Sequence, residues 1–523
     1  MPRLRKHWGW GFEDQEPPPE EIAAAAATAR EQLGFAPAEL ERPVPLERVD
    51  LPEPRLTPPA PLASICSTDT RDRVTHAYGR SYRDVVRAFR GRFENPPDVV
   101  ARPSDEADVE RVLAWCEQAG AAAIPFGGGT SVVGGVEPPG DRPAVTVDLC
   151  RLDRVLEVDT LSRAARIGAG ATGPALEAQL REHGLTLRHF PQSFEYSTLG
   201  GWIATRAGGH YATLHTHIDD FVESVRALTP RGAWESRRLP GSGAGPSPDR
   251  MLIGSEGILG VITEAWMRVQ DVPRFRESAA VAFGGFEAGA EAARALAQSG
   301  LHPSNCRLLD GAEAALTGAS PDGRALLVLG FESADHALGP WMARAVELCA
   351  DHGGEAREHA AGDRGRGGGE SAWRDAFLQA PYLRDTLVAA GIFVETFETA
   401  VTWDRFGQLV ASVRALVADA LGGEGRVSCR LTHVYPDGAA PYFTVLAPAR
   451  RGDELAQWDE IKAVASDAVL AGGGTITHHH AVGRDHRPWY DTQRPELFAE
   501  ALRSAKAAVD PAGILNPGVL IDP

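Results

Sequence analysis

Short apolar runs alternate with amphipathic segments between residues 97 and 268. Within residues 105–120 the apolar side chains recur at the spacing of one helix face, at Val109, Val112, Leu113 and Cys116. A second helix is predicted at 173–183. Three short apolar runs predict buried strands, at 121–125, 144–148 and 164–167. This half of the chain therefore predicts strands and helices in alternation.

The pattern changes after residue 272, where longer alanine-rich helices separate apolar strands. The predicted helices are 288–299, 337–352 and 404–421, and the predicted strands are 279–283, 325–331 and 391–397. This half predicts a compact α+β domain. Two segments interrupt these patterns: residues 233–249 predict a flexible connector, and the glycine-rich, charged residues 353–370 predict a mobile loop.

The N-terminal region has a different character. It begins with the Trp/Gly-rich segment Trp8–Phe12, continues through alanine-rich residues near 20–34, and ends in a proline-rich tract that reaches Pro61. We interpret it as a partly helical extension that wraps another domain. The predicted organisation is an N-terminal extension at 1–94, a first domain at 95–272 and a second domain at 273–523.

Composition narrows the classes of function. The 523 residues are 43% hydrophobic and 24% charged, as in soluble globular proteins. A net charge of −18 argues against nucleic acid, and against an anionic membrane surface, as the main partner. No run of 18 apolar residues exists and the start lacks a signal-peptide hydrophobic region, which predicts a cytoplasmic protein. The six scattered cysteines lack CxxC spacing and are interpreted as core residues.

The first unusual segment is the run Pro-Phe-Gly-Gly-Gly-Thr-Ser at 125–131, directly after a predicted strand. Three consecutive glycines leave backbone N–H groups exposed and permit positive φ, so the main chain can approach a pyrophosphate closely. The run by itself is equally consistent with an ordinary turn.

A second glycine-rich segment, Gly168–Gly173, fits the GxGxxG pattern between a strand and a helix. A dinucleotide site of the Rossmann type also needs an acidic residue at the end of the next strand, about 20 residues later. The sequence there, 185–190, ends without one. A Rossmann nucleotide loop is therefore disfavoured at this position.

Two more segments carry glycine and hydroxyl residues in place of a periodic apolar face. Residues 189–210 combine serines, threonines and paired glycines with Arg206, which is a candidate partner for a phosphate. Residues 254–264 lead from glycines into a β-branched strand, which suits a flat aromatic ring lying on the backbone. An ordinary loop without a binding role remains an alternative for each segment. Together with residues 125–131, however, they make three such runs within 140 residues, which predicts one extended cofactor.

Three adjacent histidines, His478, His479 and His480, follow the strand-like residues 474–477. In a strand they would point alternately to opposite faces, with two facing one pocket. A metal site is disfavoured because adjacent strand residues rarely converge on one ion and no carboxylate follows at ligand spacing. Histidine suits proton transfer near neutral pH and, when charged, holds phosphate.

The three glycine-rich runs resemble the FAD-binding domain of the vanillyl-alcohol-oxidase type, over roughly residues 80–523. That resemblance implies a two-subdomain FAD-binding domain, an α+β substrate (cap) domain, and a C-terminal segment, Asp510–Gly518, that returns to the FAD domain. Some members tether FAD through a histidine in the first loop. Here Thr130 occupies that place, which implies non-covalent FAD.

The resemblance assigns residues of all three runs to FAD. They are Pro125, Phe126, Gly127, Gly128, Gly129, Thr130, Ser131, Gln192, Ser193, Phe194, Glu195, Tyr196, Ser197, Thr198, Thr205, Arg206, Ala207, Gly208, Glu256, Gly257, Ile258, Leu259, Gly260, Val261 and Ile262. No metal is expected.

Within this superfamily the chain is most similar to the alkyldihydroxyacetonephosphate synthase family, through the Trp8 segment, residues 193–207, residues 428–432 and the three histidines. Members exchange the acyl chain of acyl-dihydroxyacetone phosphate for a fatty alcohol, with FAD as an electrophile and no net redox change. The resemblance implies catalytic roles for Tyr442, Arg307 and the three histidines, and substrate binding by Arg384.

Other interpretations of these side chains remain open. Tyr442 also fits an aromatic side chain that packs in the core from a strand, and Tyr435, seven residues earlier, is the alternative match to the family's tyrosine. Isolated arginines such as Arg307 and Arg384 are ordinarily solvated surface residues. The sequence departs from the family at Gln192, where aspartate is usual, and after the histidines, at 483–487. These departures leave the substrate open.

Two other functions fit the same fold. One is an FAD-dependent 2-hydroxy-acid dehydrogenase or oxidase of the D-lactate or glycolate type, and the other is a non-catalytic flavoprotein. The retained Tyr442, Arg384 and histidines argue against the second. A lipid substrate makes peripheral membrane contact plausible, although no basic amphipathic helix supports it. A homodimer is left open.

Overall fold

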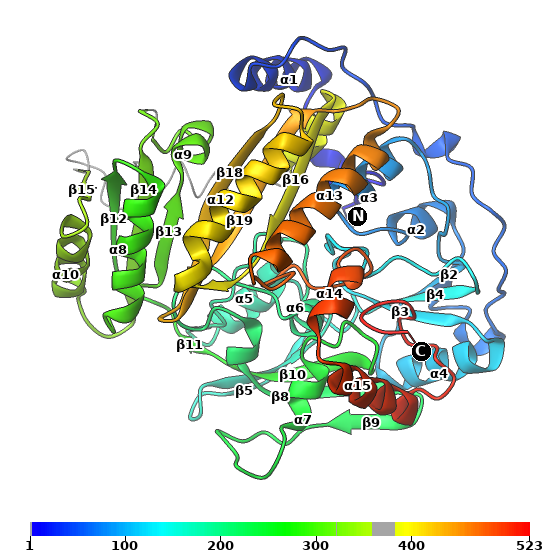
Figure 1. Ribbon diagram of the computed structural model, residues 1–523. Helices are drawn as coiled ribbons and strands as arrows, with labels where there is room; N and C mark the ends of the chain where they lie inside the picture. Colours follow the sequence, from blue (N-terminus) through cyan, green and yellow to red (C-terminus); the bar gives the residue numbers. More distant parts are fainter. Residues whose placement is uncertain (1–2, 321, 358–381, 523) are drawn as a thin grey trace.

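The β-sheets fall into two systems, each packed over its own apolar core (Figure 1). The first system belongs to the first domain and the second system to the second domain. The computed structural model describes residues 3–320, 322–357 and 382–522. The predicted mobile loop at 353–370 lies largely outside the described residues.

The first system begins with a four-stranded sheet in the order β1-β2-β4-β3. Its strands are β1 (Cys66–Ser67), β2 (Val99–Ala101), β3 (Ala122–Phe126) and β4 (Ala144–Asp148). Helix α4 (Glu106–Ala119) connects β2 to β3, and both strands pair parallel to β4. The Asp105 side chain caps the start of α4, and Gly120 ends it in the left-handed conformation. The helix and strands predicted here are confirmed.

An antiparallel five-stranded sheet follows, in the order β5-β6-β10-β8-β9. Its strands are β5 (Val155–Asp159), β6 (Ala164–Gly168), β8 (Val222–Thr229), β9 (Gly232–Glu235) and β10 (Val261–Arg268), and its helices are α5 (Gly173–Arg181), α6 (Leu199–Thr205) and α7 (Pro248–Leu252). The start of the predicted connector at 233–249 is wrong, because β9 occupies it. A ribbon of β7 (Leu185–Thr186) and β11 (Gln270–Asp271) leads to the second domain.

The GxGxxG segment serves packing. A Cβ on Gly170 would lie 1.8 Å from the carbonyl oxygen of Leu149, and one on Gly173 would lie 2.3 Å from the Phe194 ring. These glycines are needed because neighbouring chain passes directly against them.

The second system is one large antiparallel sheet in the order β15-β12-β14-β13-β18-β19-β16, with β17 paired to β19. Its strands are β12 (Phe275–Phe283), β13 (Asn305–Leu309), β14 (Ala325–Ser333), β15 (Glu355–Ala356), β16 (Ile392–Glu398), β17 (Val401–Thr402), β18 (Arg426–Val434) and β19 (Gly438–Pro448).

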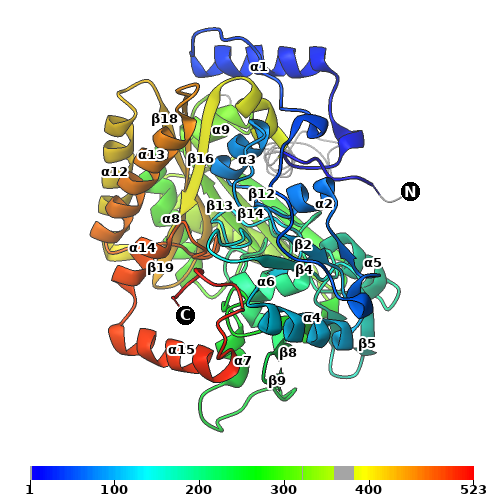
Figure 2. The same ribbon diagram turned by 90° about the vertical axis from the view of Figure 1, so that its right-hand side faces the viewer.

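Helices cover the outer face of this sheet. They are α8 (Phe286–Gln298), α10 (Gly339–Ala350), α12 (Trp403–Ala420) and α13 (Glu454–Ala471), with the short α9 (Gly311–Leu316) after β13. Figure 2 shows α12 and α13 side by side on the outside of the strands. The predicted helices at 288–299, 337–352 and 404–421 are confirmed within a few residues at each end.

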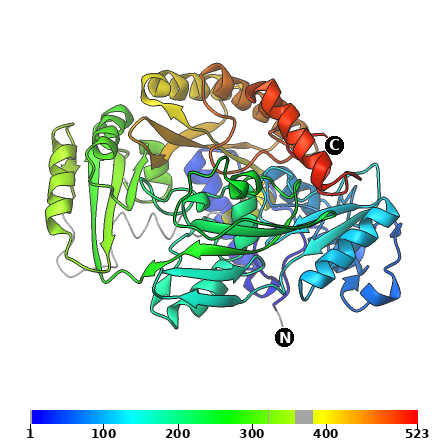
Figure 3. The ribbon, with the colours of Figure 1, turned by 90° about the horizontal axis from the view of Figure 1, so that it is seen from below.

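The N-terminal segment packs on the core of the large sheet, and the C-terminal segment packs on the core of the first domain. Near the N-terminus lie α1 (Pro19–Leu33), α2 (Thr70–Thr75) and α3 (Tyr82–Phe89), together with the 3₁₀ turns Glu13–Gln15, Leu46–Arg48 and Ala60–Leu62. Trp8, Trp10 and α3 share the core of the large sheet. At the other end, α14 (Arg487–Gln493) and α15 (Glu496–Val509) return to the first domain (Figure 3), where Leu515 bridges Ala123 of β3.

The sequence prediction of an α+β fold with a two-subdomain first domain and an α+β second domain is confirmed. Among the helices of the described residues, none has the length and apolar character that a membrane crossing requires.

Candidate active site

A cavity of about 550 Å³ lies between the first domain and the inner face of the large sheet. All three glycine-rich runs line one wall of the cavity, and β13, β16, β18, β19 and the loop after α13 line the other. The sequence-predicted residues that line it are Pro125, Phe126, Gly127, Gly128, Gly129, Thr130, Ser131, Gln192, Ser193, Ser197, Thr198, Thr205, Ala207, Gly208, Glu256, Gly257, Gly260, Ile262, Arg307, Arg384, Tyr442, His479 and His480.

The glycine-rich run at 125–131 crosses the run at 189–210 at close range. A Cβ on Gly127 would lie 2.1 Å from the Thr198 hydroxyl, and a Cβ on Gly128 would lie 2.1 Å from the carbonyl oxygen of Tyr196. Gly129 has a φ of +64°. Only glycine fits these positions, because any side chain would push the two runs apart.

The crossing leaves a row of free donors at the cavity wall. Within the part of the chain that the structure describes, the backbone N–H groups of residues 127–132 donate to no protein acceptor. The Ser131 hydroxyl also accepts from Gly135 N at 3.0 Å, which fixes the turn. Such a nest of amides binds an anion. These residues therefore fit the pyrophosphate of FAD.

The glycine-rich run at 254–264 is joined to the C-terminal segment, Asp510–Gly518. The side-chain amide of Asn516 donates to the carbonyl oxygens of Gly135, at 3.0 Å, and Glu256, at 2.7 Å. The buried Glu256 carboxylate accepts from the amides of Val482 and Gly483, at 2.9 and 2.8 Å. Burial raises the pKa of Glu256 to about 7. Residues 254–264 and the loop that follows the three histidines at 478–480 are thus tied together.

Several residues that the resemblance assigned to FAD do not line the cavity. These are Phe194, Glu195, Tyr196, Arg206, Ile258, Leu259, Val261 and, among the catalytic candidates, His478. Arg206 instead pairs with Asp219, with Nη2 2.7 Å from Oδ2, and its contact with a phosphate stays a prediction. Ile258, Leu259 and Val261 belong to the apolar core. From the sequence alone, residues that line the cavity could not be distinguished from neighbouring residues that pack in the core behind it.

The histidine loop is a bend and not a strand, so the alternation predicted for it is wrong. The fully buried Glu398 carboxylate, at the end of β16, accepts from the backbone N–H groups of His478, His479 and His480 at 2.6, 3.1 and 2.9 Å. It also accepts from the Thr477 hydroxyl at 2.7 Å. Three successive amides converge on one carboxylate because the backbone folds around it.

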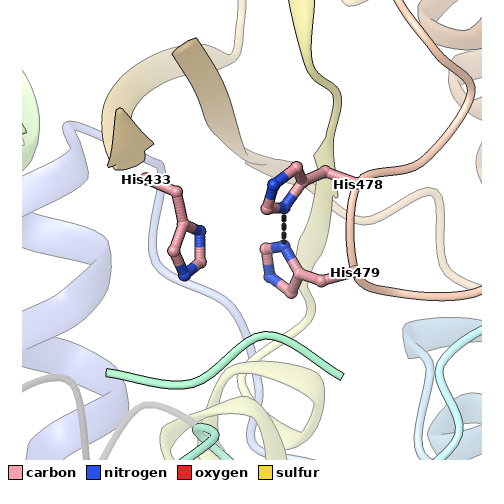
Figure 4. A group of neighbouring side chains, drawn as sticks. All are labelled: His433, His478 and His479. Atoms are coloured by element: carbon pink, nitrogen blue, oxygen red, sulfur yellow. Dashed lines mark hydrogen bonds between the residues drawn. The ribbon is translucent and has the colours of Figure 1, made fainter. Parts of the chain in front are cut away.

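This bend sorts the three side chains. His479 and His480 line the cavity beside Tyr442, whose ring lies 6.1 and 5.4 Å from theirs between centroids. His478 does not line the cavity, and its Nδ1 lies 2.9 Å from Nδ1 of His479 (Figure 4). The prediction that two of the three histidines face one pocket is confirmed, although they are neighbours and not alternate residues.

His433, which the sequence analysis missed, stands opposite this pair. Its Nε2 lies 3.2 Å from the carbonyl oxygen of Gly209, and one ring nitrogen of each of His433, His478 and His479 lies within 4.8 Å of the others. Burial, followed by the neighbouring positive groups, lowers the pKa of all three imidazoles well below its usual value. Burial likewise lowers the pKa of His480 to about 4. The imidazoles are therefore neutral at pH 7.

Arginines form the remaining polar wall. Arg430 of β18 lies over the Tyr442 ring, 3.8 Å from its centroid, and pairs with the buried Glu313. Beside it, burial and the charge of Arg430 lower the pKa of Arg307 to about 9. Arg384 donates to the carbonyl oxygen of Arg80 at 2.8 Å and to the Thr396 hydroxyl at 3.3 Å. Tyr442 is thus a cavity residue and not a core aromatic.

Comparison with known protein families agrees with this geometry. Residues 97–236 match the family model described as FAD binding domain, and residues 272–520 match the model of the FAD linked oxidases, C-terminal domain. The p-cresol methylhydroxylase structure, at 15% identity and a TM-score of 0.70, has the same fold and covers 97% of this chain and 98% of its own.

The chain is 31% identical over 483 residues to alkyldihydroxyacetonephosphate synthase of Dictyostelium discoideum, covering 87% of this chain and 78% of that protein. It is 30% identical to the protein of the same name from Trypanosoma brucei brucei, with the same coverage. A probable mitochondrial D-lactate dehydrogenase of Danio rerio is 26% identical, over 86% of this chain and 90% of that protein. An alkyldihydroxyacetonephosphate synthase structure aligns at a TM-score of 0.82 and 25% identity, covering 99% of this chain and 100% of its own. The chain therefore belongs to the alkyldihydroxyacetonephosphate synthase-like family of FAD-linked enzymes, of the vanillyl-alcohol-oxidase type.

Proposed function

We propose that the protein is an alkyldihydroxyacetonephosphate synthase, which exchanges the acyl chain of acyl-dihydroxyacetone phosphate for a fatty alcohol. The observation that carries this proposal is one cavity that combines Tyr442, three histidines and three arginines with an apolar entrance. A small hydroxy acid would need the polar groups but not the apolar lining.

The apolar part of the cavity suits two long alkyl chains. It is lined by α1, α9 and the helical residues 382–389, together with β16 and β19: Ala29, Leu33, Leu316, Leu383, Leu387, Val394 and Leu446. Two of these leucines, Leu316 and Leu383, are exposed and mark the entrance. Burying a chain along this surface stabilises the complex by roughly 0.8 kcal/mol per methylene.

The arginines offset the overall negative charge where the substrate phosphate must bind. Arg384 is held at the cavity wall by the carbonyl oxygen of Arg80 and by Thr396, so its guanidinium is fixed before the substrate arrives. In the proposed reaction Arg384 binds the phosphate, and Arg307 and Arg430 stabilise negative charge at the ketone end.

Bound FAD supplies an electrophilic ring and takes up no net electrons in this reaction. The protein holds the substrate carbon next to that ring and moves the protons. Neutral His479 and His480 accept a proton beside the reacting carbon, and the Tyr442 hydroxyl transfers a proton to or from the departing carboxylate and the arriving alcohol. Arg430, stacked on the Tyr442 ring, keeps the hydroxyl in position.

We further propose that FAD is bound non-covalently. Thr130 stands in the loop where a tethering histidine would stand, and the loop holds the cofactor through backbone N–H groups. Acid precipitation of the yellow protein is therefore expected to release all flavin into the supernatant, and flavin retained in the pellet would contradict this.

The proposed function is tested with purified holoenzyme, palmitoyl-dihydroxyacetone phosphate and hexadecanol under anaerobic conditions. Ether product is expected without lasting bleaching of the flavin absorbance, and Tyr442→Phe is expected to reduce its formation by about 100-fold while flavin remains bound. Bleaching by D-lactate or glycolate without ether formation would instead make the protein a 2-hydroxy-acid dehydrogenase.

A further inference from the structure

A chain of hydrogen-bonding side chains leads away from the cavity behind His479. Its first link is the contact between the two Nδ1 atoms of His479, which lines the cavity, and His478, which does not. The rings lie at 85° to each other with 5.2 Å between centroids, so the contact joins ring edges and is not a stack. A neutral imidazole donates with one nitrogen and accepts with the other, so it can take a proton on one side and release one on the other.

The second link starts from the opposite edge of His478. Its Nε2 lies 2.6 Å from the Tyr435 hydroxyl and 3.1 Å from Nε2 of His217. The Tyr435 hydroxyl also contacts the Thr216 hydroxyl at 3.0 Å. Every atom needed to move a proton from His479 to Tyr435 or His217 is therefore within hydrogen-bonding distance of the next.

Both end points reach the outside of the protein. Tyr435 lines a second hollow of about 420 Å³, together with Thr402, Asp437 and Gln493. His217 is half-buried, and its Nδ1 lies 3.0 Å from the carbonyl oxygen of Arg206, a residue whose side chain is 55% exposed. Water at either place is a proton acceptor.

The surroundings keep this path neutral. His433 packs along His478, and Asp219 and Asp220 lie near the Tyr435 end. Glu398 faces the histidines from β16, and Arg307 and Arg430 face them from β13 and β18. Burial raises the pKa of Tyr435 to about 12, so its hydroxyl stays protonated and can both donate and accept.

We propose that His479, His478 and Tyr435 form a proton path from the cavity to the surface, with His217 as a second exit. The inference rests on the proposed function, because that reaction must dispose of one proton. The ester C–O bond to the substrate carbon breaks and the carboxylate leaves with the electron pair. The alcohol oxygen forms the new C–O bond and loses its proton, so each turnover yields one ether, one carboxylate and one H⁺.

Alkyl chains that fill the cavity would displace water from it, which favours a proton route through side chains. Tyr442, His479 and His480 can collect the proton, but among the described residues only His479 is hydrogen-bonded through its side chain to His478 and beyond. His478 thus acts behind the reacting groups as a relay, and Tyr435 and His217 act as its outlets. The alternative role of the His433, His478 and His479 rings is to bind a metal ion.

The test compares kcat and KM of holoenzyme carrying His478→Gln or Tyr435→Phe, with His183→Gln as the control at an exposed histidine. His478→Gln is expected to reduce kcat at least about tenfold, with KM and flavin absorbance unchanged. Added imidazole is expected to restore much of that loss, because a small buffer molecule replaces the missing proton carrier. Tyr435→Phe is expected to have a smaller effect, because His217 remains, and the double variant Tyr435→Phe/His217→Gln is expected to match His478→Gln.

Three results would overturn the path: unchanged kcat in His478→Gln, a loss that imidazole does not restore, or one equivalent of zinc in the purified protein that disappears in that variant. The inference also has a readout that does not need turnover. In ring-¹⁵N-histidine spectra of the holoenzyme, protonating His217 is expected to shift the signals of His478 and His479, and Tyr435→Phe is expected to shift His478. Signals of His478 and His479 that do not respond to His217 or to Tyr435→Phe would overturn the path, whether or not the protein makes ether. Absence of ether product from the wild-type protein would reject the proposed function and leave this test of the path in place.

Discussion

The two walls of the cavity are built by different means. The first-domain wall is made of backbone, because glycines at 127–129 let two loops cross and leave amides facing the cavity. The wall of the large sheet is made of side chains that buried ion pairs and carboxylates hold in place, such as Arg430 on Glu313 and the histidine loop on Glu398. The first wall needs particular residues at the site itself, whereas the second depends on partners far away in the sequence.

This difference has a physical origin. Backbone amides point inward wherever φ and ψ place them, so glycines at 127–129, packed against Tyr196 and Thr198, form an anion site without a charged side chain. A loop of three histidines has no preferred bend of its own. It acquires one because a buried carboxylate, 80 residues earlier in the chain, must be satisfied by hydrogen bonds.

The largest effect is expected from the backbone wall. Gly128→Val places a side chain where a Cβ already meets the carbonyl oxygen of Tyr196 at 2.1 Å, so the two loops must separate and the amide nest opens. Purified protein is expected to be colourless, with no flavin absorbance near 450 nm. Gly241→Val, where a Cβ meets nothing within 4 Å, is the control and is expected to stay yellow. A yellow, active Gly128→Val protein would remove the distinction between the walls.

A change in the second wall is expected to reduce turnover and leave flavin bound. Glu398→Gln replaces one acceptor oxygen with an NH₂ group that faces backbone donors, so the histidine loop shifts. We expect a loss of about 100-fold in kcat and of about 1–3 kcal/mol in the free energy of unfolding. Glu395→Gln removes a neighbouring buried carboxylate, bonded to Trp458, that does not line the cavity. It is expected to cost stability without this loss of kcat, and equal losses in both variants would argue against a specific role of Glu398.

A smaller effect is expected at Arg384, the proposed phosphate-binding residue. Arg384→Gln keeps a hydrogen-bonding side chain but removes the charge, and is expected to raise KM for acyl-dihydroxyacetone phosphate by about tenfold with little change in kcat. Arg405→Gln, on a side chain that is 62% exposed, is the control. A change in kcat alone would place Arg384 at the reacting carbon and not at the phosphate.

The smallest effect concerns acid stability of the second wall. The pKa of His480 is about 4 in the folded protein and 6.5 when unperturbed, so the unfolded chain binds more protons between these values. Stability therefore falls as pH falls from 6.5 to 4, by up to about 3 kcal/mol from this group. Burial alone would raise the pKa of Glu398, but the neighbouring histidines and its hydrogen bonds hold it at about 2, which adds a further loss below about pH 4.5.

Thermal unfolding midpoints measured from pH 7.5 to 4.5 test this expectation. His480→Gln is expected to flatten the dependence and His183→Gln to leave it unchanged. A wild-type midpoint that does not fall toward pH 4.5 would mean that the buried imidazoles are already charged at neutral pH.

The sequence by itself determined the local elements and the glycine-rich wall of the cavity. Helix α4, the strands around it and the glycines at 127–129 follow from apolar periodicity, capping residues and backbone freedom, all of which act over a few residues. Tyr442, Arg307 and Arg384 were recognisable only through the family resemblance, because nothing next to them in the sequence distinguishes them from core or surface residues.

Only the tertiary structure decided how the second wall is assembled. It showed that Arg206 pairs with Asp219, that His478 lies outside the cavity with its Nδ1 against that of His479, and that His433 and Arg430 complete the site. The physical reason is that hydrogen bonds and ion pairs of buried groups join residues that are far apart in the chain. Which partner satisfies which group is fixed only when the sheets close over the cavity.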